Sequence, residues 1–276
     1  LSRLAYTSPQ GMSSSEGGFD ETIAIIGGGP AGLSCAYYLA EKGYTPTVFE
    51  KNEKPGGMLV YGIPSYKLEK DVVAAEIDVI REMGVDIRCG VEVGKDITLD
   101  ELRAQGYKAF YIAIGCQGGR KAGIPGEDAQ GVMTAVDFLR TVGGNPDYPV
   151  EGEVVVVGGG NVAIDVARSS VRCGANRVSM VEEARVEGVA VNCGWGPKEI
   201  LTENGKVTGI VFKKCLSVLD ENGRFAPVYD ENQTKTVACS HVYLSIGQAI
   251  EWGHLLDGSK VELGRGNGAV ADSLTY

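Results

Sequence analysis

Glycines at two places in the chain have the spacing of a nucleotide-binding turn. The first set, from Gly27 to Gly32, has the pattern G-x-G-x-x-G. Its first glycine permits a tight turn, its second lets backbone approach a pyrophosphate, and its third lets a helix pack closely on a strand. The N-terminus of that helix offers N–H groups to the phosphates. Glu50 follows about 20 residues later, where an acid binds ribose hydroxyls. The set predicts a dinucleotide site, the alternative being a packing turn that binds nothing.

The second set, from Gly158 to Ala163, reads G-G-G-N-V-A, and alanine is an allowed third residue of the fingerprint. It predicts a second dinucleotide site, against the same alternative. Glu182 follows about 20 residues after Gly158, where an acid holds the ribose diol of NADH and an arginine favours NADPH.

The residues around Glu182 are too few for a normal crossover. Only Glu182–Gly188 separate the strand expected to end at Val181 from the apolar stretch Val189–Val191, whereas a crossover between parallel strands needs about a dozen residues. We therefore expect residues to be absent from the chain near 181–183, so Glu182 does not decide between NADH and NADPH.

The elements that position these turns form two repeats of strand, glycine turn, helix and strand. Two later long strands, separated by a turn at Asp220–Arg224, indicate a hairpin or meander. The expected strands are Thr22–Ile26, Thr45–Glu50, Val85–Arg88, Ala109–Ile114, Val154–Val157, Arg177–Val181, Val207–Leu219 and Thr236–Ile246. The expected helices are the stretch containing Leu33, Ala36, Leu39 and Ala40, then Leu68–Met83, then Val162–Arg172.

This order predicts an α/β fold with two Rossmann-like dinucleotide-binding domains, the second nested within the first. Each is three-layered, with a parallel central sheet and a β-meander. The Pro/Gly-rich stretch Gly143–Gly152 indicates a boundary. We expect a flexible lead-in at 1–18, a discontinuous FAD-binding domain at 19–145 and 244–276, and an NAD(P)-binding domain at 146–243.

Composition excludes several other classes. The net charge of −10 argues against a nucleic-acid-binding surface. No apolar run approaches the roughly 20 residues of a membrane span, and no signal peptide is evident. Seven scattered cysteines without a C-x-x-C pair predict a cytoplasmic protein with reduced thiols, no dithiol chemistry and no metal site. Cys116 and Cys193 are expected to be buried, inert thiols.

A long run after Glu50 resembles the glutamate synthase small-subunit family of FAD-dependent pyridine nucleotide-disulfide oxidoreductases, which is similar to the flavin portion of dihydropyrimidine dehydrogenase. Glu50-Lys51, Pro55–Leu59, Tyr61–Pro64 and Lys67-Leu68 match E-K-x-x-x-P-G-G-x-L-x-Y-G-I-P-x-x-K-L. Ala113–Gly115, Ile124–Glu127, Gly158–Arg168 and Ser245–Gln248 also resemble family segments, so the resemblance covers about residues 20–276.

The resemblance implies FAD at the first turn and NAD(P)H at the second, with hydride passing from nicotinamide to flavin by cofactor positioning and without a catalytic acid or base. Val91–Val93 would hold the adenine through backbone atoms. The cofactor-binding residues implied are Gly27, Gly29, Pro30, Ala31, Gly32, Glu50, Lys51, Gly56, Gly57, Met58, Leu59, Gly62, Lys67, Val93, Ala113, Gly115, Gly158, Gly160, Asn161, Val162, Ala163 and Gly247.

The resemblance also implies that electrons pass on to an iron–sulfur subunit or domain. The family's cysteine-rich N-terminal segment, the arginines after its second nucleotide-domain strand and its late G-D motif are not found in this chain. We therefore expect a flavin domain that is truncated at its C-terminus. Two alternatives stay open, a stand-alone NAD(P)H-dependent flavin reductase or oxidase and a flavin-free nucleotide-binding module.

Overall fold

The computed structural model of the chain describes residues 19–145, 147–181, 190–191, 193–264 and 266–272. The chain divides into two compact units, unit 1 (Leu1–Gln117 with Ala249–Tyr276) and unit 2 (Gly118–Gln248). The chain passes from one unit to the other after Gln117 and after Gln248, whereas the expected domain boundaries lie near 145 and 244. The reason is that β6 (Val132–Thr134) and α5 (Ala135–Gly144) belong to the second sheet and its helical layer. The expected lead-in at 1–18 lies outside the described residues.

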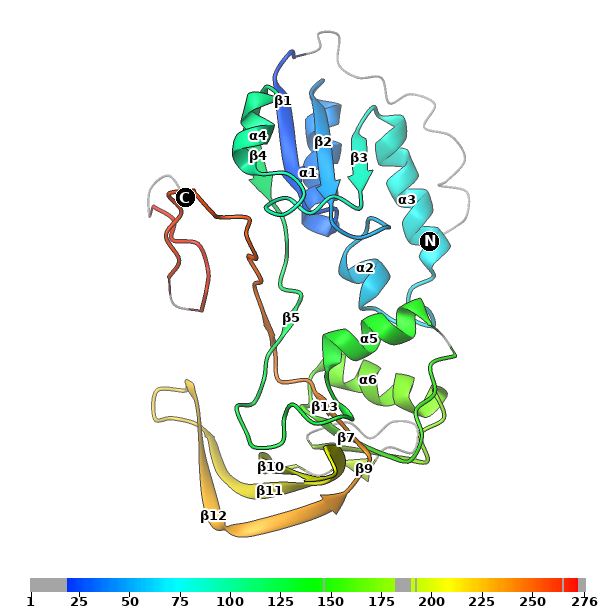
Figure 1. Cartoon of the computed structure of the whole chain (residues 1–276), viewed down its shortest axis with the longest axis vertical. Coiled ribbons are helices and arrows are strands. Elements are labelled where there is room, and N and C mark those ends of the chain that lie inside the picture. The colour runs from blue at the N-terminus through cyan, green and yellow to red at the C-terminus, as the bar shows by residue number, and fades with distance from the viewer. Residues whose placement is uncertain (1–18, 146, 182–189, 192, 265, 273–276) are drawn as a thin grey trace. The chain divides into compact units, whose positions relative to one another are not determined.

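The sheet of unit 1 has four parallel strands in the order β3-β2-β1-β4. The strands are β1 (Thr22–Ile26), β2 (Thr45–Glu50), β3 (Asp86–Cys89) and β4 (Tyr107–Ile112). The first three lie side by side in Figure 1. Side chains of a strand alternate between the two faces, and both faces of β1 are buried: Ile25 lies in one apolar cluster, while Ala24 and Ile26 lie in another.

Helices flank this sheet. The helix α1 (Pro30–Glu41) packs against β2 and α3 (Lys70–Glu82), and the short helix α2 (Met58–Tyr61) contacts α3. The helix α4 (Leu99–Ala104) contacts β4 and begins with a capping box, in which Thr98 and Glu101 each satisfy the other's backbone N–H. The glycine turn between β1 and α1 follows the carboxyl end of β1. In parallel sheets of this class, ligands bind at the carboxyl ends of the strands.

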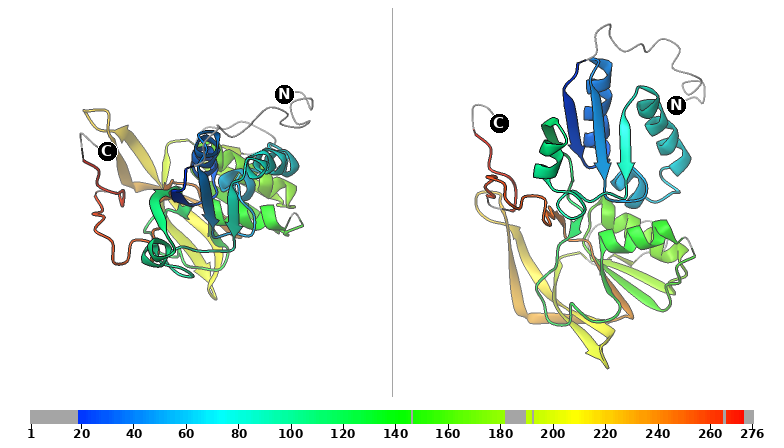
Figure 2. Two further views of the ribbon diagram at one scale, coloured as in Figure 1. Left: turned by 90° about the horizontal axis from the view of Figure 1, so that it is seen from above. Right: turned by 45° about the horizontal axis from the view of Figure 1, so that its top comes forward.

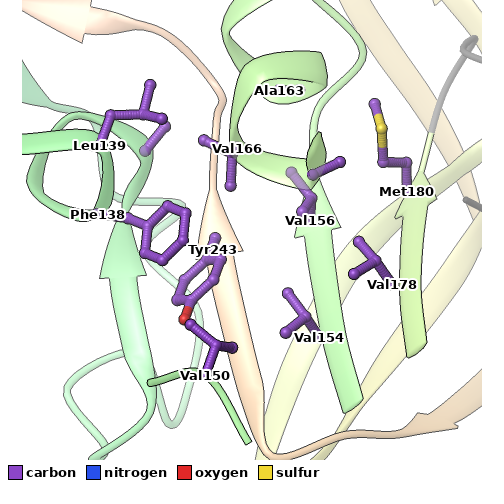
Figure 3. Packing of buried hydrophobic residues seen from close by; sticks show 12 residues of the cluster. Phe138, Leu139, Val150, Val154, Val156, Ala163, Val166, Val178, Met180 and Tyr243 are labelled. Atoms are coloured by element: carbon purple, nitrogen blue, oxygen red, sulfur yellow. The ribbon is translucent and has the colours of Figure 1, made fainter. Parts of the chain in front are cut away.

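The sheet of unit 2 has the order β6-β13-β7-β8-β9, and all of its strands are parallel. Its other strands are β7 (Glu153–Val157), β8 (Arg177–Val181), β9 (Ala190–Val191) and β13 (His241–Leu244), and α6 (Asn161–Arg172) follows β7. Val154 and Val156 face the cluster made by α5 and α6 (Figure 3). In that cluster the rings of Phe138 and Tyr243 stack with centroids 4.2 Å apart.

An antiparallel meander covers the other face of this sheet. It consists of β10 (Trp195–Glu203), β11 (Lys206–Leu219) and β12 (Phe225–Ala238), and Figure 2 shows its long ribbon in two further views. Val155 and Val157 pack against Ile210 and Phe212 of β11. Helices, parallel sheet and meander make three layers, which confirms the predicted α/β fold class.

One expected strand is wrong. Thr236–Ile246 is not continuous, since β12 ends at Ala238 and β13 begins at His241. The Cys239 N–H donates to Thr208 O of the meander, whereas the Ser240 N–H donates to Glu153 O of the parallel sheet. The chain therefore changes partner strands within two residues. Because the apolar pattern continues across this change, the sequence alone predicts a single strand.

Two minor differences complete the layout. The expected strand at 109–114 begins and ends earlier, as β4, and β5 (Gly118–Gly119) and β14 (Gln248–Ala249) form a separate two-stranded sheet. Within the described residues, every helix is too short or too polar to cross a bilayer.

Candidate functional site

The turn between β1 and α1 is shaped by two glycines that have no room for a side chain. Gly27 has φ +111°, and a Cβ built on it would lie 2.4 Å from Ala113 O. A Cβ on Gly32 would lie 1.9 Å from Gly27 O. The Gly27 N–H donates to Phe49 O at 2.8 Å, which joins the turn to β2. The fingerprint spacing is therefore a steric requirement of this turn.

The helix N-terminus at this turn carries no side-chain cap. Gly29 is the N-cap residue, with extended backbone and no capping hydrogen bond, and Pro30 occupies the first helical position. The first N–H groups of a helix have no intrahelical partner and carry partial positive charge. Gly29, Pro30 and Ala31 all line a pocket of about 420 Å³ in unit 1. This end of α1 has the donor chemistry of an anion site.

Glu50 is buried beside that turn, with 3% of its surface exposed. Its Oε2 accepts from the Gly28 N–H at 2.8 Å, and its Oε1 accepts from the Asn52 N–H at 2.8 Å and from Asn52 Nδ2 at 2.6 Å. A carboxylate can accept about four hydrogen bonds. Oε2 therefore keeps acceptor capacity toward the pocket, which Glu50 lines.

The P-G-G segment packs directly against the first turn. The Gly56 N–H donates to Gly28 O at 2.7 Å, and a Cβ built on Gly57, where φ is +54°, would lie 2.8 Å from Gly29 Cα. Two backbone segments thus approach each other without side chains between them. Met58, the first residue of α2, lines the pocket, and a Cβ on Gly62 would meet Met58 Cε at 2.2 Å.

Lys70 makes internal contacts in this region. Its Nζ donates to Leu59 O at 2.7 Å, within α2, and to Ile63 O, just after it. Burial lowers the pKa of the Lys70 ammonium. Lys67, the residue singled out from sequence, is exposed and does not line the pocket.

The predicted site residues of unit 1 separate into two groups. Those that line the pocket are Gly27, Gly29, Pro30, Ala31, Glu50, Lys51, Gly57, Met58, Val93, Ala113 and Gly115. Gly32, Gly56, Leu59 and Gly62 lie behind it as packing positions, with Leu59 against Leu33, Val73 and Ile77. Gly247 belongs to unit 2, where its carbonyl accepts from the Arg120 N–H at 3.1 Å.

One wall of the pocket was missed by sequence reasoning. Ile250, Glu251, Trp252 and Leu255 line it, all from the segment that returns to unit 1. The available signal was a set of large apolar residues in an otherwise polar stretch, including Trp252, Leu255 and Leu256.

The two cysteines expected to be buried are exposed. Cys116 lines the pocket, and Cys193 lies in unit 2 just before β10. Cys116 lies between β4 and β5 and Cys193 lies between β9 and β10, so both are outside the regular elements that form the core. All seven cysteines are free thiols.

The second turn, between β7 and α6, has the same construction in unit 2. Gly158 has φ +130°, and a Cβ on it would lie 2.3 Å from Ser245 O. Gly160 is the N-cap of α6 without a side-chain cap, and a Cβ there would meet nothing within 4 Å. Asn161 and Val162 are exposed in the first turn, whereas Ala163 is fully buried against the sheet. Glu182 and the expected gap at 181–183 fall in a stretch of which 182–189 lies outside the described residues.

Comparison with known proteins gives a family match over nearly the whole chain. Residues 21–275 match the sequence model of the pyridine nucleotide-disulphide oxidoreductases. The chain is 37% identical over 296 residues to the NADP(+)-dependent formate dehydrogenase subunit beta of Moorella thermoacetica, covering 98% of this chain and 41% of that protein. It is 36% identical over 254 residues to the glutamate synthase [NADPH] small chain of Halomonas elongata, covering 83% and 53%.

Solved structures agree on the fold. Mycobacterium tuberculosis FprA in complex with NADPH superposes with a TM-score of 0.72 at 21% identity, over 83% of this chain and 71% of that one. A thioredoxin reductase of Lactococcus lactis superposes with a TM-score of 0.66 at 18% identity, over 92% and 86%. The chain spans about half or less of the length of the curated relatives above. The first alignment is longer than the chain's 276 residues, so that relative has residues without a counterpart here.

Proposed function

Because the chain belongs to the pyridine nucleotide-disulphide oxidoreductase family, we propose that unit 1 binds FAD, that unit 2 binds NAD(P)H, and that hydride passes from the nicotinamide to the flavin. Such an enzyme is an NAD(P)H-dependent flavoprotein oxidoreductase. The observation that carries the proposal is the pocket of unit 1, which brings the bare N-terminus of α1 and the buried acceptor Glu50 to one cavity.

The residues present fit a dinucleotide. Free N–H groups at α1 suit a pyrophosphate, the remaining lone pair of Glu50 suits a ribose hydroxyl, and the glycine-to-glycine contact at Gly29 and Gly57 leaves backbone open to a ligand. When bound, the flavin supplies the hydride-accepting ring. The protein would hold the pyrophosphate at α1, orient the ribose at Glu50 and line the cavity with Met58 of α2.

The onward acceptor is the second part of the proposal. We propose that electrons leave to an iron–sulfur subunit or domain, as the family resemblance implies. The name of the formate dehydrogenase relative describes a subunit, and that of the glutamate synthase relative describes a small chain. The chain has no C-x-x-C motif, so a cluster would be held by another segment or partner.

The test is flavin loading followed by reduction. Purified chain is incubated with FAD, separated from free cofactor and treated with NADPH or NADH without oxygen. We expect retained flavin colour that bleaches on adding the reduced nucleotide. The control is Gly158→Ala, which should retain the colour but no longer bleach, since its new Cβ would lie 2.3 Å from Ser245 O in the second turn. A chain that stays colourless, or a flavin that neither nucleotide reduces, contradicts the proposal.

A further inference from the structure

The pocket wall formed by the returning segment is built around one tryptophan. Trp252 lines the pocket and packs with the apolar cluster that contains Phe49, Val93 and Leu255. Its indole Nε1 donates to the main-chain oxygen of Asn267 at 2.8 Å. The indole N–H therefore has a fixed partner, and Trp252 contributes to the cavity surface.

Asn267 holds two points of this wall together. It adopts φ +64°, a left-handed conformation that asparagine tolerates better than most residues. Its Nδ2 donates to Ile250 O at 3.1 Å, and its own N–H donates to Gly264 O at 3.2 Å. Asn267 therefore connects Ile250 and Trp252 of the wall to the hairpin in which Leu263 pairs with Ala269.

The wall is also fixed to the loop after β3. A Cβ built on Gly94 would lie 2.5 Å from Leu255 N, so that loop and the returning segment are in backbone contact. The loop contributes Val91, Glu92 and Val93 to the pocket. The loop after β3 and the returning segment therefore line the same pocket, and Trp252 lies in one apolar cluster with Phe49 and Val93.

The charges of the lining residues indicate what this end accepts. Of the charged lining residues, Glu92 comes from the loop after β3 and Glu251 precedes Trp252 in the returning segment. Acids beside Trp252 disfavour a phosphate there but not a flat, neutral aromatic group. A dinucleotide with its pyrophosphate at α1 and its ribose at Glu50 extends its base toward the β3 side of the sheet.

We infer that Trp252 is the side chain on which the adenine of the cofactor stacks, and that Asn267 is the residue that positions it. This inference rests on the proposed cofactor site, and it adds a specificity determinant from a segment outside the glycine fingerprint. Aromatic side chains that stack on bases make substantial contributions to affinity.

The experiment uses ADP, which contains the adenine, ribose and pyrophosphate but no flavin. The chain has two tryptophans, Trp195 in unit 2 and Trp252, so Trp195→Phe leaves Trp252 as the sole tryptophan reporter. In that background we expect ADP and FAD to quench tryptophan fluorescence. Trp252→Ala should weaken ADP and FAD binding about tenfold, while Trp252→Phe, which keeps an aromatic ring, should stay within about threefold.

Two further variants test the positioning role. Asn267→Val disfavours the left-handed backbone and should weaken ADP binding and alter the emission of Trp252. Asn267→Gly permits that backbone and keeps the main-chain acceptor but loses the Nδ2 bond to Ile250 O, so it should bind ADP more tightly than Asn267→Val and less tightly than the wild type. If Asn267 only stabilises the fold, Asn267→Val should lower the unfolding midpoint but leave the ADP-induced quench of Trp252 fluorescence unchanged.

The outcomes separate this inference from the proposed function. If Trp252→Ala binds ADP and FAD with unchanged affinity, or if bound ADP leaves Trp252 fluorescence unchanged, the stacking inference is overturned and the flavin site stands. If the unmodified chain binds ADP in a Trp252-dependent way but never retains FAD, the flavin proposal fails and the stacking inference holds. A chain that binds neither ligand overturns both.

Discussion

At the residue scale, glycines of this chain differ in what a methyl group would meet. Gly27 and Gly84 both have positive φ, +111° and +93°. A Cβ on Gly27 would lie 2.4 Å from Ala113 O, whereas a Cβ on Gly84 would meet nothing within 4 Å. The backbone strain is therefore similar at the two positions, and only Gly27 adds a collision with backbone.

This contrast predicts the effect of Gly27→Ala. Gly84→Ala should cost about 1–2 kcal/mol, the usual penalty for a side chain in left-handed backbone. Gly27→Ala should cost more than that, because Ala113 must also move, and it should abolish FAD retention. Urea unfolding of both variants measures the difference in stability. Equal losses of stability would show that the β1–α1 turn is not sterically fixed.

Glu50→Gln tests the buried acceptor. An amide offers one acceptor oxygen in place of two, so either the Gly28 N–H or the donors of Asn52 lose their partner. We expect FAD affinity to fall about tenfold and stability to fall by about 1–2 kcal/mol. Glu53→Gln, at an exposed neighbouring position, is the matched control in the same flavin titration. The acceptor role is wrong if both variants bind FAD equally well.

Burial of Cys239 makes stability depend on pH. Burial raises the pKa of this thiol from 9.0 to about 12. Above pH 9 the unfolded thiol ionises while the folded thiol stays protonated. The free energy of unfolding should therefore fall as pH rises from 9 toward 12, by up to about 1.4 kcal/mol per unit.

The measurement compares urea midpoints at pH 7.5 and pH 10 for the wild type and Cys239→Ala. Removing the thiol should reduce the pH dependence, although Tyr243, whose pKa burial also raises, keeps part of it. The assignment to Cys239 is rejected if both proteins lose the same stability between the two pH values.

At the scale of elements, α2 depends on a lysine outside the expected site. Lys70 Nζ donates to Leu59 O and Ile63 O, whereas Lys67 is exposed. Lys70→Met should lower stability by about 1–3 kcal/mol, since hydrogen bonds from charged donors are lost, and should weaken FAD binding by loosening α2.

Lys67→Met is the matched control, three residues away in the same segment. Because the Lys67 side chain is exposed, this change should lower stability by less than Lys70→Met does. Urea midpoints and flavin titrations of the two variants provide the comparison. If Lys67→Met weakens FAD binding more than Lys70→Met does, Lys67 is the cofactor-binding lysine, as the sequence motif predicts.

The glycine-rich turns and the strands beside them were predictable because each depends on local chemistry. At Gly27, Gly32 and Gly158 the backbone tolerates no side chain, so the sequence pattern follows directly from the structure. The β1, β2 and β8 bounds were also correct, since each is a short apolar run between turn residues.

Other features depended on contacts between distant segments. The end of β12 at Ala238 is set by a change of partner strands, and nothing local marks it. The returning segment that carries Trp252 contacts Gly94, far away in sequence, through Leu255. Lys70 was missed for a similar reason, since its role depends on carbonyls that α2 presents in space.

At the scale of the whole molecule, the two units have separate hydrophobic clusters, with Ile25 in one of unit 1 and Val156 in one of unit 2. We expect calorimetry to resolve two unfolding transitions. A ligand that binds only one folded unit stabilises only that unit. FAD should raise one transition temperature and NADPH the other.

Gly158→Ala supplies the control for this prediction. The variant should lose the NADPH-dependent shift and keep the shift caused by FAD, since its collision with Ser245 O lies within unit 2. A single transition that both cofactors raise would contradict independent loading of the two units.

The return of the chain to unit 1 at Ala249 determines the order of events during synthesis on the ribosome. Chains emerge from the N-terminus, and domains generally fold as units as they appear. All of unit 2 must be made before Ile250, Trp252 and Leu255 can close the first pocket. The nucleotide site encoded first is therefore completed last, and a nascent chain acquires its second site before its first.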